Sequence, residues 1–244
     1  MRVKSVVSSL ILPNKGDIIK MNLDGTERQY RVLSVNGNVC KVMGMFNDLT
    51  SAYNSTSTTI TMGTLTVQKY ENSTLDIYLN TTWYNTLSST AKGAIVPENI
   101  VCDAWYRNDK GDPVYSGTYG TSVPGTGNYT ISKYTGGTLN IGNRNVFILG
   151  VQDVIDYLSD DSVKVDTTAI LRNVNIWKMF WNDGSEYTNE APLLRSSSAN
   201  DYYSAWCVSG DYGSLLYSGA PSRSNIVRPA LNLDLSKIEW STAT

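Results

Sequence analysis

The chain has no histidine, and this absence excludes more chemistry than any other feature of its composition. Zinc sites of the usual kind, Ser-His-Asp triads and Cys-His nucleophiles all depend on an imidazole. Enzymes can work without histidine, so the absence argues against catalysis without excluding it. We therefore expect a binding or structural protein and no enzyme.

Cysteine is also scarce. Cys40, Cys102 and Cys207 are odd in number and far apart, and no C-x-x-C occurs. A disulfide framework does not fit this spacing. We expect the three side chains to act as small buried hydrophobes.

Charged residues make up 17% of the chain, and the formal net charge is −2. No run of Lys and Arg forms a basic stripe, so nucleic acid is not an expected partner. No apolar stretch approaches the ~20 residues of a membrane span, so we expect no membrane insertion. The basic and then apolar start lacks a cleavage-site pattern, and we expect it to be an arm or first strand rather than a signal peptide.

Serine, threonine, asparagine and tyrosine supply most of the polarity, a mixture that favours strands joined by long loops. The order of expected elements does not alternate strand with helix, which predicts one α+β domain with two main helices on mixed or antiparallel sheets. We place an N-terminal arm at 1–15, the domain at 16–235 and a C-terminal tail at 236–244. Either end segment could dock to a partner.

Several elements have local signals. A three-strand meander is expected over 18–45, with a hairpin turn at Asn36-Gly37. Ser73, with Asp76 three residues on, is expected to cap a helix, and Ser88 or Ser89 a second one. Further helices are expected over 152–158 and from about 167 to 181. Loops are expected over 47–58 and 108–145, the second with one weak hairpin left open. Strands are expected over 60–68, 99–106, 146–150, 191–195, 205–209, 215–218 and 226–233.

Tyrosine and tryptophan are abundant, sixteen and six against three phenylalanines. Their flat apolar faces and polar edges suit sugar stacking and protein recognition. They concentrate with Ser, Asn and Gly in residues 196–224, as in antibody-like binding loops. An ordinary surface loop is the alternative. The candidate ligand-binding residues are Asn200, Asp201, Tyr202, Tyr203, Trp206, Asp211, Tyr212 and Tyr217.

Two arginines frame this stretch, Arg195 and Arg228, each within an apolar run. A buried charge is costly unless it is paired or fully hydrogen-bonded, and a guanidinium has donors enough to tie several loop carbonyls. We predict that both are structural clamps beneath a loop surface, without a chemical role. Replacing Arg228 by Met should then destabilise the fold.

Two longer stretches carry a resemblance. They are residues 70–88, with Leu75-Asp-Ile-Tyr-Leu-Asn, and residues 193–231, with Leu193-Leu-Arg-Ser-Ser and Val227-Arg-Pro-Ala-Leu. Tyr30-Arg-Val-Leu and Val146-Phe-Ile-Leu-Gly add weaker matches. Together they resemble an uncharacterised domain family of bacteria and prophages. That family is similar to the C-type-lectin fold in the broad sense, the group of formylglycine-generating enzymes and diversified phage receptor-binding proteins.

The resemblance implies a C-type-lectin-like fold and a non-enzymatic function. The expected protein is a structural or receptor-binding component of a bacteriophage or phage-derived particle, on its tail, baseplate, fibre or capsid surface. Its partners would be other particle proteins and a host glycan or protein; a homo-oligomer is left open. The alternative is a bacterial surface or secreted lectin-like adhesin. Formylglycine generation needs two reactive cysteines near the end of the chain, where only Cys207 lies.

Metal binding has one weak signal. Trp181-Asn182-Asp183 matches a triplet that supplies calcium ligands in many sugar-binding C-type lectins. The acidic, proline-containing triplet that should precede it is missing, so a helix end and a turn at Gly184 are the preferred interpretation. Asp160-Asp161 is interpreted as a solvated turn. We assign no metal ligand and leave calcium open.

Overall fold

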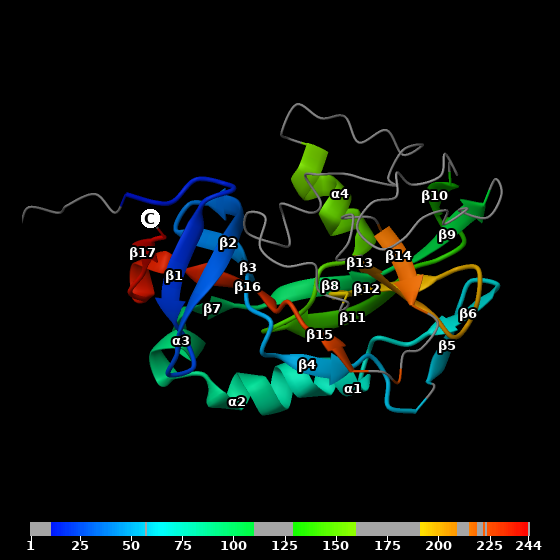
Figure 1. The fold of residues 1–244 in the computed structure, drawn as a ribbon, viewed down its shortest axis with the longest axis horizontal. Helices are drawn as coiled ribbons and strands as arrows, with labels where there is room; N and C mark the ends of the chain where they lie inside the picture. The colour runs from blue at the N-terminus through cyan, green and yellow to red at the C-terminus, as the bar shows by residue number, and fades with distance from the viewer. Residues whose placement is uncertain are drawn as a thin grey trace, which may run out of the picture.

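The computed structural model describes residues 11–56, 58–109, 129–159, 191–208, 215–218, 222 and 224–243. Strands dominate and helices are few, so the protein is α+β. Figure 1 shows the two larger sheets at opposite ends of the long axis, a six-stranded sheet at the left and a five-stranded sheet at the right. Across the described part of the chain, every helix is too short or too polar to cross a membrane.

The six-stranded sheet is antiparallel throughout, in the order β17-β1-β2-β3-β16-β7. The meander expected over 18–45 is confirmed. Asn36 pairs with Val39, so the turn residues are Gly37 and Asn38, one position later than expected. Gly37 has φ +57°, as in turns that place glycine first. The strands are β1 Ile18–Asn22, β2 Glu27–Asn36, β3 Val39–Gly44, β7 Ile95–Val96, β16 Ala230–Asp234 and β17 Ser241–Thr242.

The end of the chain is part of this sheet. After the 3₁₀ turn Leu235–Lys237, Ser241 and Thr242 pair with Lys20 and Ile19 of β1. Trp240 packs against the hydrophobic core. The segment 236–244, expected to be a free tail, therefore belongs in large part to the folded domain.

The five-stranded sheet has the order β10-β9-β12-β13-β14. Only β12 and β9 run parallel, so the sheet is mixed. The strand expected over 215–218 is confirmed, while the strand expected over 191–195 begins two residues later and continues to 198. The strands are β9 Ala104–Asp109, β10 Tyr129–Lys133, β12 Leu193–Ser198, β13 Ala205–Val208 and β14 Leu215–Ser218.

The remaining described strands form three two-stranded ribbons. They pair β8 Glu98–Cys102 with β11 Leu139–Arg144, β15 Ser224–Ile226 with β4 Thr50–Ala52, and β5 Thr59–Met62 with β6 Leu65–Gln68. β4 lies where a loop was expected, and β10 and β11 lie in the stretch expected to be a loop with one weak hairpin; each pairs with a segment that is distant in the sequence. Residues 146–150 are buried as expected but form only a single bridge, between Phe147 and Ala230.

The helices begin where the sequence indicated. Ser73 accepts a hydrogen bond from the Asp76 amide at 3.0 Å, and Ser88 from the Ala91 amide at 3.1 Å. The first helix runs through α1 Thr74–Ile77, the π-helical segment η1 Tyr78–Trp83 and α2 Tyr84–Thr86, followed by α3 Ser89–Ala94. These helices lie along the lower side of the molecule in Figure 1, and α4 Val151–Ser159 lies on the upper side. The helix expected from 167 falls outside the described residues.

One large hydrophobic cluster joins the two ends of the molecule. Tyr30 and Val42 enter it from the six-stranded sheet, Leu79 from the first helix, and Leu194 and Trp206 from the five-stranded sheet, all less than 1% exposed. The five-stranded sheet is therefore anchored on a rigid scaffold, and so is the turn that links β12 to β13.

Candidate ligand-binding site

The turn between β12 and β13 carries the first four candidate residues, and it is fixed at its base by buried serines. All six residues of β12 are buried. The Ser197 hydroxyl donates to the Gln68 carbonyl at 2.6 Å, and the Ser198 amide to the Ser204 carbonyl at 3.0 Å. These bonds hold both sides of the turn against neighbouring strands. A polar run that resembled a loop in the sequence is thus a central strand.

Gln68, at the end of β6, holds the top of the turn. Its Nε2 donates to the Tyr202 carbonyl at 2.7 Å, and its Oε1 accepts from Asn54 Nδ2 at 3.0 Å. Gln68 and Asn54 are 1% and 2% exposed. A buried and satisfied polar network of this kind restrains backbone geometry. Sequence reasoning missed both residues; a glutamine closing an apolar strand was the available signal.

Tyr202 and Tyr203 project from this fixed turn and are 45% and 48% exposed. Their ring centroids lie 3.6 Å apart with the planes tilted by 39°, and their hydroxyls are hydrogen-bonded. Asp201 Oδ1 accepts from the Tyr203 amide at 2.8 Å, which closes a local turn. Asn200 is exposed beside them. The turn therefore presents two aromatic rings, an amide and a carboxylate together.

The other four candidates are not part of this group. Trp206, on β13, is fully buried. Its assignment as a ligand-contacting residue is corrected: the ring packs in the core, where no ligand reaches its face. Tyr217 pairs with Trp206 across β13 and β14. Asp211 and Tyr212 lie outside the described residues.

The family model of DUF6273, a domain of unknown function, matches residues 57–235. The chain belongs to the DUF6273 family. No curated protein and no solved structure matches it. The matched span contains the β12–β13 turn, its Gln68 support and both framing arginines, so the turn lies within the DUF6273 domain.

Arg195 ties three elements of the DUF6273 domain together. Its Nη1 donates to the Ile148 carbonyl at 2.8 Å and to the Asp153 carboxylate, and its Nε lies 3.4 Å from the Val101 carbonyl. Burial lowers the pKa of this guanidinium. The charge and the hydrogen bond of Asp153 raise the pKa by more than burial lowers it, so the pKa lies above its ordinary value. The expected burial is confirmed, and the contacts are those of a clamp.

Arg228 is buried too, at 3% exposure, but it is held differently. Its Nη1 donates to the Phe46 carbonyl at 2.8 Å, and its Nε has no hydrogen-bond partner. Within the described residues it forms no ion pair, and burial lowers its pKa to about 10. Of the carbonyls that the structure describes, one rather than several accepts from Arg228.

Ser196 of β12 and Asp103, between β8 and β9, form another buried polar contact. Ser196 donates to Asp103 Oδ1 at 2.5 Å and accepts from the Val151 amide at 2.9 Å, at the start of α4. Lys133 Nζ lies 3.3 Å from the other Asp103 oxygen. The Ser196 hydroxyl is thus engaged both as a donor and as an acceptor, and the residue is fully buried, which fits a structural role.

The cysteines are free and buried, as expected. Burial raises the pKa of the Cys102 and Cys207 thiols to about 12, which opposes formation of a reactive thiolate. Among the described residues, no group of three or more acidic or sulfur ligands could hold a metal ion. The Trp181-Asn182-Asp183 triplet and Asp160-Asp161 lie outside them.

Proposed function

We propose that the DUF6273 domain of this chain is a non-enzymatic binding module that recognises a host surface glycan through the β12–β13 turn. The exposed Tyr202–Tyr203 pair carries the proposal. Aromatic faces stack on sugar rings, and neighbouring amide and carboxylate groups bond to hydroxyls. Asn200 and Asp201 supply those groups on the same turn.

Rigidity supports the same conclusion. Ordering a mobile loop on binding costs affinity, whereas a turn held in place beforehand avoids that cost. Gln68 fixes the Tyr202 carbonyl, Ser204 and Ser198 close the turn, and the Ala199 amide donates to the Trp105 carbonyl at 2.8 Å. Binding residues are often placed on loops above a rigid scaffold in this way.

The biological setting is proposed from the resemblance of the sequence. We place the protein on the surface of a bacteriophage or phage-derived particle, in a C-type-lectin-like fold, where it attaches the particle to a host cell. The α+β architecture with a mixed sheet and long connections is compatible with that fold. Calcium is not required by any contact described at the turn.

Glycan binding is tested with immobilised bacterial surface polysaccharides and the full chain. Tyr202→Ala and Tyr203→Ala should each weaken binding by about tenfold or more, as for aromatic anchors at binding sites. Tyr202→Phe should retain most of the affinity because the ring remains. Ile77→Ala, at a residue 50% exposed on the first helix, is the control and should bind like the parent.

Two outcomes would contradict the proposal. Binding that is unchanged in both tyrosine variants would exclude the turn as the site. Electron microscopy of particles that carry the labelled protein tests the location, and a purely cytosolic protein would overturn it. Glycan binding with no particle association would favour the bacterial adhesin instead.

A further inference from the structure

Two buried side-chain amides connect the segment after β4, strand β6 and the β12–β13 turn. Asn54 Nδ2 donates to the Lys69 carbonyl at 3.1 Å and to Gln68 Oε1 at 3.0 Å. Gln68 Nε2 in turn donates to the Tyr202 carbonyl at 2.7 Å, across 134 positions of the sequence. We call the side chains of Asn54 and Gln68 the amide relay.

The carbonyls at its two ends fix the direction of the amide relay. The Lys69 and Tyr202 carbonyls can only accept hydrogen bonds, so each must face an NH₂ group rather than an amide oxygen. The NH₂ group of Asn54 has two N–H donors, one for the Lys69 carbonyl and one for Gln68 Oε1. With its oxygen engaged there, Gln68 directs its own NH₂ group at the Tyr202 carbonyl. Asn54 therefore sets the orientation of the amide that holds the turn.

The main chain that carries the amide relay is held by other contacts. Gln68 pairs with Thr59 across β5 and β6. Next to Asn54, the Tyr53 carbonyl accepts from the Leu75 amide at 3.2 Å. A change of either relay side chain therefore removes its hydrogen bonds without removing a strand.

The amide relay reaches the exposed tyrosines through the Tyr202 carbonyl. In the described part of the chain, the other hydrogen bonds of Tyr202 and Tyr203 stay within the turn. Their hydroxyls bond to each other, and the Tyr203 amide donates to Asp201 Oδ1 at 2.8 Å. The bond from Gln68 is therefore the one that ties this part of the turn to a neighbouring strand.

We propose that Asn54 and Gln68 are positioning residues of the binding site at the β12–β13 turn. The amide relay sets where the two tyrosine rings stand, and thereby the affinity for the glycan, without touching the ligand. This inference rests on the proposed function of the turn and deepens it, because it makes binding depend on two residues outside the turn. A turn that must be ordered on binding loses affinity. Loss of the amide relay should therefore weaken binding while both rings remain.

Gln68→Glu tests the amide relay by replacing one NH₂ group with oxygen. At pH 7.5 the carboxylate still accepts from Asn54, but it cannot donate to the Tyr202 carbonyl and repels it. At pH 4.5 the carboxyl is largely protonated, since burial raises the pKa of a carboxyl, and its O–H can donate to that carbonyl. The variant should therefore have a loosened turn at pH 7.5 and a restored turn at pH 4.5. A change that only destabilises the fold would not reverse in this way.

The exchange of the Tyr203 amide with water, followed by NMR in the full chain, reports the state of the turn without a ligand. In Gln68→Glu it should be about tenfold faster than in the parent at pH 7.5, and close to the parent rate at pH 4.5. Asp201 and the Lys69–Glu71 ion pair titrate in the parent as well, so the parent at the same pH is the reference. Asn54→Leu should speed the exchange several-fold at both pH values, because leucine has no proton to lose.

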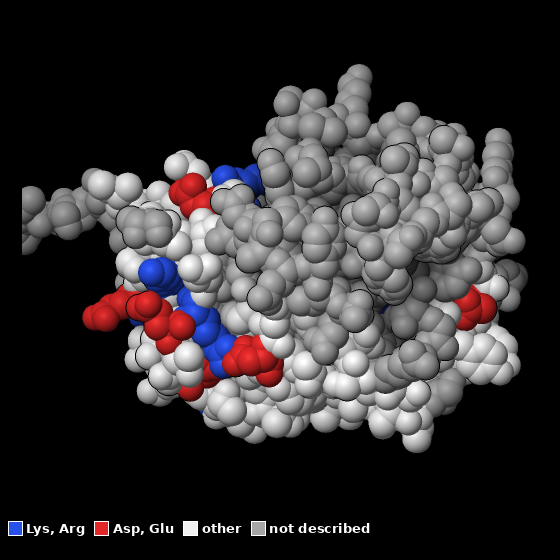
Figure 2. All heavy atoms as spheres, viewed as in Figure 1, with Lys and Arg blue, Asp and Glu red and all other residues white. Residues whose placement is uncertain are grey.

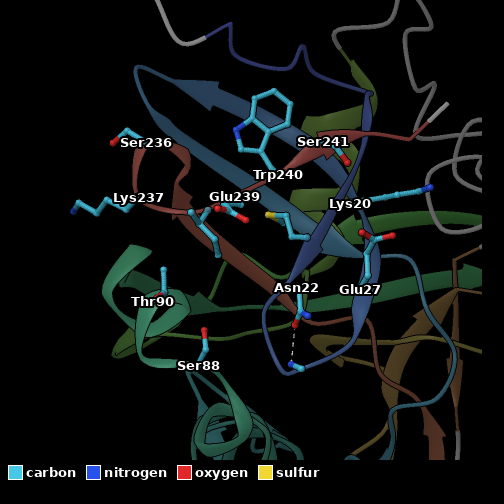
Figure 3. A pocket seen from close by; sticks show the side chains of 13 residues that line it. Lys20, Asn22, Glu27, Ser88, Thr90, Ser236, Lys237, Glu239, Trp240 and Ser241 are labelled. Atoms are coloured by element: carbon cyan, nitrogen blue, oxygen red, sulfur yellow. Dashed lines mark hydrogen bonds between the residues drawn. The ribbon is translucent and has the colours of Figure 1, made fainter. Parts of the chain in front are cut away.

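Two variants are the matched controls. Asn22→Asp also adds one carboxylate, at an exposed residue beside an open hollow of about 910 Å³, and its Oδ1 can still accept from the Gly25 amide at 2.8 Å (Figure 3). This hollow borders the six-stranded sheet, at the opposite end of the long axis from the five-stranded sheet (Figure 1), where Figure 2 shows charges of both signs. Asp76→Asn weakens a buried contact outside the amide relay. Both controls should exchange the Tyr203 amide at the parent rate.

The same variants are then measured on immobilised bacterial surface polysaccharides. Gln68→Glu should bind about tenfold more weakly than the parent at pH 7.5 and like the parent at pH 4.5. The proposal is overturned if exchange in Gln68→Glu does not depend on pH relative to the parent, if Asn54→Leu exchanges like the parent, or if a loosened turn binds with unchanged affinity. A parent that binds no polysaccharide, in which exchange still responds as expected, would contradict the proposed function and support the hold of the amide relay on the turn.

Discussion

The Arg195 guanidinium donates a hydrogen bond to Asp153 Oδ2 at the start of α4. The same oxygen also accepts a hydrogen bond from the Gly150 amide at 2.8 Å. Arg228, by contrast, donates to one carbonyl of the described residues, that of Phe46, and has no described counter-ion. Both arginines occupy apolar runs and both are buried. Their environments give them different contributions to stability.

The structure therefore revises the expectation for Arg228. Arg195→Met leaves the Asp153 carboxylate and two carbonyls without their donor, and we expect it to lower the free energy of unfolding by about 3 kcal/mol. Arg228→Met removes an uncompensated charge along with one hydrogen bond, and these effects largely offset each other, to within about 1 kcal/mol. Urea unfolding of the two variants measures both values. Equal losses of unfolding free energy in the two variants would show that Arg228 has a partner that stabilises its charge as much as Asp153 stabilises the charge of Arg195.

Asp76 is a second centre of buried polar contacts. It accepts from Arg144 Nε at 2.9 Å and Nη2 at 3.0 Å, and from the Asn72 amide at 2.9 Å, and it is 3% exposed. Asp76→Asn keeps the shape but leaves Arg144 without its charge partner. We expect the free energy of unfolding to fall by about 3 kcal/mol.

The matched control for Asp76 is an ion pair whose carboxylate is exposed. Asp48, whose side chain is 58% exposed, pairs with Arg28. Asp48→Asn should change stability by less than about 1 kcal/mol, because solvent screens the pair. Both variants can be compared by thermal and urea unfolding. Similar losses in the two would contradict the importance assigned to burial at Asp76.

Gly63 sits in the β5–β6 turn with φ +62°, and a Cβ there would lie 2.3 Å from the Gly136 carbonyl oxygen. Gly63→Ala should therefore cost more than backbone strain alone, about 3 kcal/mol in total. Gly25 has φ +94° and nothing within 4 Å, so Gly25→Ala carries only the strain, about 1 kcal/mol. A cost at Gly63 no larger than that at Gly25 would show that the segment around Gly136 moves aside freely.

Local signals in the sequence predicted much of the fold, and non-local pairing decided the rest. The meander and the caps at Ser73 and Ser88 depend on residues within a few positions, and they are confirmed. The place of Ser241 and Thr242 beside β1 depends on a pairing more than 200 residues apart, so the sequence suggested a tail. No local pattern could reveal it.

For the candidate site, too, local composition predicted one part and distant contacts decided the other. Aromatic and polar composition located the turn at Asn200–Tyr203, since exposed loops are read well from composition. It could not tell that Trp206 points into the core, because alternation along β13 is hidden when the whole strand is buried. Gln68, distant in sequence from the turn that it supports, had no local signal linking it to Tyr202.

Cys207 gives a prediction for alkaline pH. Cys207 is 4% exposed, and burial raises the pKa of its thiol from 9.0 to about 12. The unfolded chain ionises this thiol above pH 9 while the folded chain keeps it protonated. Its contribution to stability is thus complete below pH 9 and is lost as the pH rises towards 12. At pH 10 the loss should be about 1 kcal/mol.

Cys207→Ala isolates this contribution from other alkaline effects. The variant should be less stable than the parent at pH 8 because it leaves a small cavity. Since alanine cannot ionise, that difference in the free energy of unfolding should shrink by about 1 kcal/mol between pH 8 and pH 10. Urea unfolding at the two pH values measures it under reducing conditions. A difference that stays constant with pH would mean that the thiol ionises as readily in the folded chain as in the unfolded chain. Solvent would then reach Cys207 on β13.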